Sequence, residues 1–225
     1  MNSGIIVAAG RGLRVGKNVD KAFLSLGSKP VLVYSLLAFE KCRDIEEVIL
    51  AVRRERIESA RCVVQMFGCT KVRKIVGGGA QRHVSVAKGL AEISDDTTIV
   101  AVHDGARPCV TPELISETIK AAKKYGSGVA AIKITDTVKE AQHGMVISDT
   151  IDREKLWMAQ TPQAFKLDLL LKGIKAASRK RLTVTDEASA VELVSDAVRL
   201  VQSSPSNIKI TTPDDLVLAA ALMRL

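Results

Sequence analysis

The feature that most constrains the fold of this chain is a series of short, continuously apolar segments that alternate with helical patterns. The predicted strands cover residues 5–9, 47–52, 72–76, 98–103 and 128–134. Helical patterns cover residues 31–41, 81–93 and 112–124. Strands that are apolar on both faces are typical of a parallel sheet covered by helices on each side. The pattern therefore predicts an α/β fold, doubly wound around a mostly parallel sheet.

The region from residue 134 to 152 breaks this alternation. Two strand-like runs flank the segment Gln142-His143-Gly144, which predicts a β-hairpin with a short loop. Its faces are mixed and rather polar, so we expect either an arm that pairs with a second copy of the chain or a plain hairpin at the sheet edge. Beyond it we predict helices near 167–178 and 186–194, strands at 197–202 and 207–211, and a last helix from Pro213. We interpret residues 1–225 as one domain with this arm.

The composition narrows the class of partner. A net charge of +8 favours an anionic partner, such as phosphates, nucleic acid or an acidic membrane surface. Aromatic residues make up only 3% of the chain, which argues against stacking on nucleic acid. No apolar run approaches the ~18 residues of a membrane helix. The four cysteines form no C-x-x-C pair and no zinc spacing, which favours a reducing, cytoplasmic location, or the plastid stroma if a transit peptide has been removed.

The first predicted strand ends in a glycine-rich, basic loop, IIVAAGRGLRVGKNVDK. A dinucleotide-binding G-x-G-x-x-G is excluded because residue 15 is Val15, and a P-loop is excluded because Gly12 and Gly16 enclose three residues. Small residues there let a ligand approach the backbone at the carboxyl end of a strand: Ala8, Ala9, Gly10 and Gly12. Arg14 and Lys21 add positive charge. The loop predicts a polyphosphate site, and the alternative is a turn with solvated basic residues.

Two further segments suit a nucleotide site. GGGAQRHVSVAKGL, residues 77–90, is a second glycine turn that opens a helix. VHDGARP places Asp104 at the end of a strand. A carboxylate beside a triphosphate is suited to hold Mg²⁺, directly or through water, whereas an aspartate that caps a turn is the plainer interpretation.

The loop motif AAGRGLR…DK, followed by FLSLGSKPVLVYSL, resembles the signature of nucleotidyltransferases that join an NTP to a sugar phosphate. The chain departs from this signature at Val15, where methionine is usual, and at Asp20, where proline is usual. TDTVK, DREKLWMAQTPQAF, TDEASAVE and NIKIT follow in that order. With them, essentially the whole chain resembles the 2-C-methyl-D-erythritol 4-phosphate cytidylyltransferase family of the non-mevalonate isoprenoid pathway. The resemblance implies a Rossmann-like nucleotidyltransferase fold.

The resemblance also implies an activity and a set of site residues. The expected reaction transfers CMP from CTP to methylerythritol phosphate and releases pyrophosphate, with Mg²⁺ or another divalent cation held at Asp104. The catalytic residues would be Arg14, Lys21, Arg153 and Lys209. CTP would be bound by Ala8, Ala9, Gly10, Gly12, Gly79, Ala80, Arg82, Ser85, Asp104 and Ala106. The sugar phosphate would be surrounded by Arg107, Thr137, Arg153, Thr161, Thr185 and Lys209. The arm would join a homodimer and bring Thr137 into the partner's site.

The expected chemistry needs no side-chain nucleophile, because the sugar phosphate supplies its own attacking oxygen. That phosphate is ionised near neutral pH, so we assign no catalytic role to His83, His103 or His143. Two alternatives stay open. One is a cytidylyltransferase for another polyol phosphate, such as ribitol 5-phosphate. The other is a non-enzymatic basic module that binds nucleic acid, which a strong salt dependence of binding would reveal.

Overall fold

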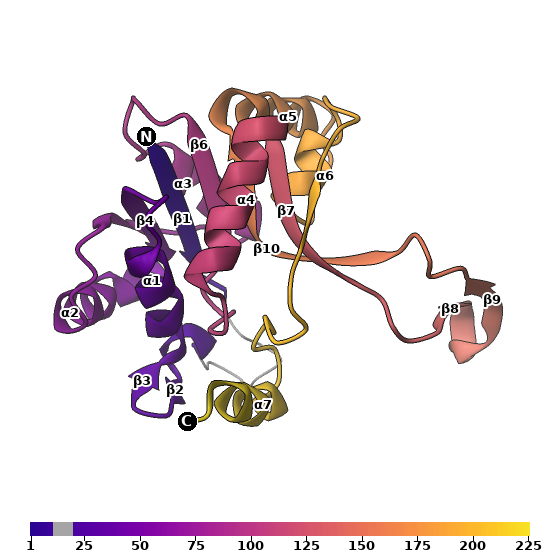
Figure 1. The fold of residues 1–225 in the computed structure, drawn as a ribbon, viewed down its shortest axis with the longest axis horizontal. Helices are drawn as coiled ribbons and strands as arrows, with labels where there is room; N and C mark the ends of the chain where they lie inside the picture. Colours follow the sequence, from indigo (N-terminus) through magenta and orange to yellow (C-terminus); the bar gives the residue numbers. More distant parts are fainter. Residues whose placement is uncertain (11–19) are drawn as a thin grey trace.

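The computed structural model describes residues 1–10 and 20–225. Its centre is a seven-stranded sheet of order β11-β7-β10-β6-β1-β4-β5 (Figure 1). β10 runs antiparallel to both of its neighbours, and the other pairings in this sheet are parallel. The strands are β1 (Asn2–Ala8), β4 (Glu47–Val52), β5 (Val72–Gly77), β6 (Ile99–Asp104), β7 (Ser127–Lys133), β10 (Trp157–Lys166) and β11 (Leu200–Gln202). The prediction of an α/β fold with a mostly parallel sheet is confirmed.

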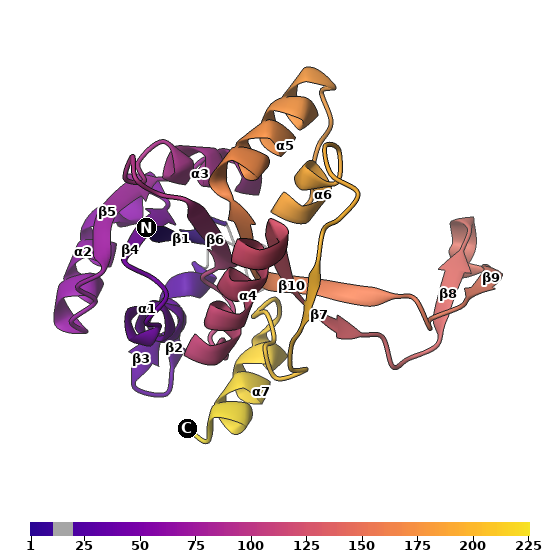
Figure 2. The same ribbon diagram turned by 45° about the horizontal axis from the view of Figure 1, so that its top comes forward.

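Helices cover both faces of the sheet (Figure 2). One face carries α1 (Val31–Lys41), α2 (Ile57–Met66) and α4 (Pro112–Tyr125). The other carries α3 (Arg82–Leu90), α5 (Leu167–Arg179) and α6 (Glu187–Val191). The last helix, α7 (Pro213–Met223), packs beside the sheet against the short strand β2 (Ser25–Leu26), which pairs with β3 (Lys29–Pro30). The two-sided cover explains why the strands read as continuous apolar runs.

The side chains of the central strands show this arrangement directly. Ile5 and Ile6 follow each other in β1 and are both fully buried, yet Ile5 belongs to the core under α3 and Ile6 to the core under α1. Successive residues of a strand point to opposite faces, so a strand between two helical layers needs apolar residues at every position.

Local signals set the helix bounds well where caps are present. In α4, the Thr111 hydroxyl accepts a hydrogen bond from the Leu114 amide, and Pro112 occupies the first turn. Gly126 ends the helix at φ 93°, in the left-handed region that favours glycine. The predicted helix at 112–124 is therefore confirmed almost to the residue.

The elements expected from the sequence need correction. β10 was not predicted, although it lies between β6 and β7; Pro162 and a break in register between Ala159 and Gln163 interrupt its strand pattern. Helix α2 is also absent from the predicted elements, which include none between residues 52 and 72. The strand predicted at 207–211 is wrong. That segment is irregular and is joined to the body by single contacts, such as the hydrogen bond from the Ile210 amide to the Ala106 carbonyl.

The predicted hairpin is confirmed as a separate two-stranded sheet of β8 (Val138–Ala141) and β9 (Ile147–Ile151). It projects away from the body as an arm in both views (Figures 1 and 2). Of the two arrangements considered, the structure therefore has the projecting one. None of the helices in the described part of the chain has the length and apolar character needed to span a membrane.

Candidate active site

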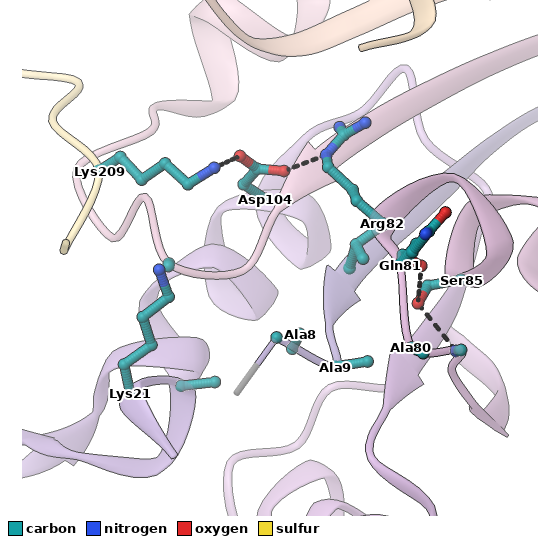
Figure 3. A pocket seen from close by; sticks show the side chains of 14 residues that line it. Ala8, Ala9, Lys21, Ala80, Gln81, Arg82, Ser85, Asp104 and Lys209 are labelled. Carbon is teal, nitrogen blue, oxygen red and sulfur yellow. Dashed lines mark hydrogen bonds and ion pairs between the residues drawn. The ribbon is translucent and has the colours of Figure 1, made fainter. Parts of the chain in front are cut away.

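A pocket lies at the carboxyl ends of β1 and β6, where the strand order reverses direction (Figure 3). From β1 the chain adds β4 and β5 on one side, and then returns to place β6 on the other side. Open α/β sheets bind ligands at this switch point. The pocket is lined by these residues predicted to bind CTP: Ala8, Ala9, Gly10, Gly79, Ala80, Arg82, Ser85, Asp104 and Ala106.

Two lysines predicted to be catalytic also line this pocket. Lys21 belongs to the short 3₁₀ helix η1 (Lys21–Phe23), and Lys209 lies on the irregular segment before α7. Figure 3 shows both side chains reaching toward the pocket from different parts of the chain. Gly12, Arg14 and the departure at Val15 lie outside the described residues.

Glycines let the second turn come close to the end of β1. A Cβ on Gly78 would lie 2.4 Å from the Cβ of Ala9 and 2.8 Å from the Oγ of Ser85. The Gly79 amide donates to Ser85 Oγ at 3.0 Å, and that hydroxyl lies 3.3 Å from the Gln81 carbonyl. The turn is therefore held against both β1 and the first turn of α3, with its backbone at the pocket.

Asp104 is the centre of an ion network in the pocket wall. Its Oδ1 accepts from Arg82 Nε at 2.9 Å, and its Oδ2 accepts from Lys209 Nζ at 2.5 Å. Arg82 in turn donates to both oxygens of Glu187, at 2.7 and 2.9 Å. Acidic and basic groups alternate along this row, so each buried charge has an opposite neighbour.

The network decides the charge state of Asp104. Burial alone would raise the pKa of this carboxyl, but the charges of Arg82 and Lys209 hold the pKa well below its usual range. Asp104 is therefore ionised at neutral pH. Burial would lower the pKa of Arg82, whereas Glu187 and Asp104 raise it above its usual value, so the guanidinium stays charged.

A second pocket lies on the other side of the same network. It contains four residues predicted to surround the sugar phosphate: Arg107, Thr161, Thr185 and Lys209. Arg82, Asp104 and Lys209 line both pockets. Two ligands bound there would meet across a shared charged wall.

Hydrogen bonds beneath this wall fix the residues that line it. Thr161 Oγ1 accepts from the Asp104 amide at 3.0 Å, and its other contact is His103 Nδ1 at 3.1 Å. Arg107 Nη1 donates to the Asn207 carbonyl at 2.7 Å, while its buried Nε has no hydrogen-bond partner among the described residues. Burial also lowers the pKa of Arg107. An anion in the second pocket would stabilise this partly satisfied guanidinium.

Two predicted residues line neither pocket in this chain. Thr137 lies at the start of the arm, and Arg153 lies just after β9, where it donates to the Thr135 carbonyl. The arm leads away from the site (Figure 1). Their assignment to the sugar phosphate stays a prediction, and it requires a second copy of the chain.

Glu187 lies within TDEASAVE and is not among the residues predicted to form the site. It is 4% exposed, and it is the anion that orients Arg82. An acidic residue in the otherwise small and apolar run EASAV was the available signal, since buried carboxylates are rare without a partner.

The donor set limits what metal the site would hold. Among the described residues there is no group of three or more His, Cys, Asp or Glu side chains that would form a metal cage. Among the residues of the described part of the chain that line the first pocket, Asp104 alone is acidic. A single carboxylate fits Mg²⁺, which is commonly held by one or two carboxylates together with substrate phosphates.

Known proteins are similar in sequence to this chain over nearly its whole length. The sequence pattern of the family described as 2-C-methyl-D-erythritol 4-phosphate cytidylyltransferase matches residues 3–225. A protein of that name from Caldanaerobacter subterraneus subsp. tengcongensis is 43% identical over 223 residues, covering 99% of this chain and 98% of the relative. One from Alkaliphilus oremlandii is 39% identical over 221 residues, covering 98% and 94%.

Solved structures share the fold. The crystal structure of 4-diphosphocytidyl-2C-methyl-D-erythritol synthase from Anaerococcus prevotii has a TM-score of 0.86 at 30% identity, covering 100% of this chain and 99% of that one. That of 2-C-methyl-D-erythritol 4-phosphate cytidylyltransferase from Thermus thermophilus has a TM-score of 0.80 at 34% identity, covering 98% of each chain.

Proposed function

This chain belongs to the 2-C-methyl-D-erythritol 4-phosphate cytidylyltransferase family, and we propose that the two adjoining pockets are where it carries out the family's reaction. The enzyme transfers CMP from CTP to 2-C-methyl-D-erythritol 4-phosphate, forms 4-diphosphocytidyl-2-C-methyl-D-erythritol and releases pyrophosphate. One observation carries the assignment of the site. Arg82, Asp104 and Lys209 line both pockets, as a group-transfer site for two anionic substrates requires.

The reaction is an in-line displacement. A phosphate oxygen of the sugar phosphate forms a bond to the α-phosphorus of CTP, and the bond from that phosphorus to the bridging oxygen of pyrophosphate breaks. Both reactants are anionic, so the protein has to hold them together and balance their charge. Lys21 and Arg14 would do so around the α-phosphate, and Lys209 from the shared wall.

Lys209 is suited to act on both substrates. Its amine is held on Asp104 Oδ2 at 2.5 Å, and its side chain lines both pockets. We therefore assign the amine to contact the phosphates of both substrates. Thr161, Thr185 and Arg107 would bind the sugar phosphate on the far side of Lys209.

The nucleotide half would be recognised largely through the backbone. Gly79 and Ala80 present main-chain groups at the pocket, and Ser85 fixes the turn that carries them. Ala8, Ala9, Gly10 and Ala106 leave room for the ligand. Asp104 would hold Mg²⁺ or another divalent cation, which when bound supplies positive charge to the phosphates.

We also propose a homodimer built through the arm. Apolar side chains at its tip are exposed: Met145 at 92%, Val146 at 63% and Ile147 at 59%. A partner subunit that covers these side chains would bury this apolar surface, and Thr137 and Arg153 would then lie at the partner's sugar-phosphate pocket.

A cytoplasmic location is proposed as well, because Cys42, Cys62, Cys69 and Cys109 are all free thiols.

The function is tested by measuring pyrophosphate release with CTP, Mg²⁺ and methylerythritol 4-phosphate, and with ribitol 5-phosphate in a parallel reaction. We expect release with the methylerythritol substrate. Pyrophosphate release only with ribitol 5-phosphate would overturn the assignment of the second pocket. No pyrophosphate release in either reaction would overturn the assigned function.

Lys21 is tested in the same assay. Lys21→Ala should lower kcat by roughly 10²–10³-fold, because the charge it places at the α-phosphate is lost. Lys120→Ala, which removes an exposed lysine on α4, serves as the control and should retain the wild-type rate. A Lys21→Ala rate equal to that of the wild type would exclude Lys21 from catalysis.

A further inference from the structure

Asp20, the residue just before Lys21, is a buried acid with a defined set of partners. Its side chain is 1% exposed. Its Oδ2 accepts from Arg53 Nε at 3.2 Å and lies 3.5 Å from Arg56 Nε. This is the position at which the nucleotidyltransferase signature has proline.

The two arginines lie just beyond the carboxyl end of β4. Arg53 directly follows β4, in which every residue is buried, and Arg56 ends the 3₁₀ helix η2 (Arg54–Arg56). Asp20 therefore joins the segment that carries Lys21 to the carboxyl end of a central strand. That end belongs to the same edge of the sheet as the pocket.

A second contact ties down the other end of η1. The Arg56 guanidinium lies 5.4 Å from the centre of the Phe23 ring, within cation–π range. The Phe23 amide donates to the Asp20 carbonyl at 3.0 Å and closes the turn. Arg56 thus contacts the residue before Lys21 and the residue two positions after it.

A gain in stability alone does not account for these contacts. Burying a carboxylate costs several kcal/mol before pairing, and a buried ion pair is often no more stabilising than apolar residues of similar volume. Asp20, Arg53 and Arg56 also line neither described pocket, so they do not offer their own charges to a ligand there. What they supply is a fixed place for η1, whose residues Lys21 and Ala22 do line the first pocket.

We infer that Asp20, Arg53 and Arg56 form a positioning clamp that holds Lys21 at the α-phosphate. The inference rests on the proposed function, because it takes the role of Lys21 from there. In the signature, a proline ring restricts the backbone before the lysine. In this chain the backbone of Asp20, at φ −88° and ψ 94°, is held instead by ion pairs to the end of β4.

The first test replaces the clamp carboxylate with an amide of the same size. Asp20→Asn should lower kcat by about 10–100-fold, since a displacement of about 1 Å is enough for such a loss. The control is Glu58→Gln, which removes an exposed partner of Arg61 on the nearby α2 and should leave kcat unchanged. Arg53→Gln removes the same contact from the other side, and it provides the measurement if Asp20→Asn does not fold.

The second test asks whether the clamp acts through Lys21. In a Lys21→Ala background, adding Asp20→Asn or Arg53→Gln should change single-turnover rates by less than about twofold, because no amine remains to be positioned. If the clamp only stabilised the fold, the rate loss of the double variant would equal the product of the two single-variant losses, and that result would overturn the inference. Wild-type kcat in both Asp20→Asn and Arg53→Gln would also overturn it. An inactive wild-type protein would instead overturn the proposed function itself.

Discussion

At the scale of single residues, His103 shows how burial sets the charge of a group inside the site. Its Nε2 faces the Arg107 carbonyl, which can only accept, so in the neutral ring Nδ1 carries no proton and accepts from the Thr161 hydroxyl at 3.1 Å. Nε2 then carries the proton, 3.4 Å from the Arg107 carbonyl. Burial lowers the pKa of His103 to about 3, so the ring is neutral at physiological pH. It orients Thr161 without adding a charge.

This buried ring predicts a specific pH dependence of stability. In the unfolded chain a histidine has a pKa of about 6.5. Between that pH and about 3 the unfolded state binds a proton that the folded state does not. The free energy of unfolding should therefore fall as the pH falls through this window, by up to about 1.4 kcal/mol per pH unit from His103.

Urea unfolding at pH 7, 6, 5 and 4 measures this contribution. His103→Gln should show a smaller loss of stability on acidification than the wild type, because the titrating group is gone. His143→Gln, at the exposed tip of the arm, should behave as the wild type does. Equal slopes for His103→Gln and the wild type would contradict the assignment of a neutral buried ring.

At the scale of elements, the short helix α6 positions Arg82. A capping box between Asp186 and Ser189 starts the helix. Gln163 of β10 then holds it in place: its amide nitrogen donates to Asp186 Oδ2 at 2.8 Å, and its oxygen accepts from the Ala188 amide at 3.0 Å. The helix is thereby fixed to the sheet and presents Glu187 to the first residue of α3.

Glu187→Ala should therefore weaken both the fold and the site. It leaves Arg82 facing Asp104 without its second anion, and breaking a buried pair costs about 3–5 kcal/mol of unfolding free energy. We expect kcat to fall as well, since Arg82 is no longer held in one orientation. Glu92→Ala, which breaks an exposed pair with Lys74, should cost less than about 1 kcal/mol. Equal losses in the two variants would show that α6 does not anchor the network.

At the scale of the whole molecule, the arm sets the expected assembly. We expect the wild type to sediment as a dimer, and the triple variant Met145→Ser, Val146→Ser, Ile147→Ser to sediment largely as a monomer because its apolar tip is lost. Serine at Val217 and Leu218, which are exposed on α7, is the matched control and should leave the dimer intact. A dimer that persists in the tip variant, or is lost in the α7 variant, would move the interface away from the arm.

The elements and motifs that the sequence determined by itself are those with local causes. The apolar runs of β1, β4 and β6, and the cap, proline and glycine around α4, lie within a few residues of the element that they specify. The same holds for the glycine turn at residues 77–79 and for Asp104 at the end of its strand. Such signals work because backbone conformation and side-chain alternation depend mainly on near neighbours.

Only the tertiary structure decided which distant segments meet. Arg82 and Glu187 are 105 residues apart in the chain, as are Asp104 and Lys209, and neither pairing follows from a periodicity. β10 forms a strand because its irregular, proline-containing segment pairs with both β6 and β7. The partners of Asp20 likewise lie more than 30 residues away in the chain. Ion pairs and strand pairs between distant segments become favourable only after the chain has folded and excluded water from them. No single segment of the sequence therefore predicts these contacts.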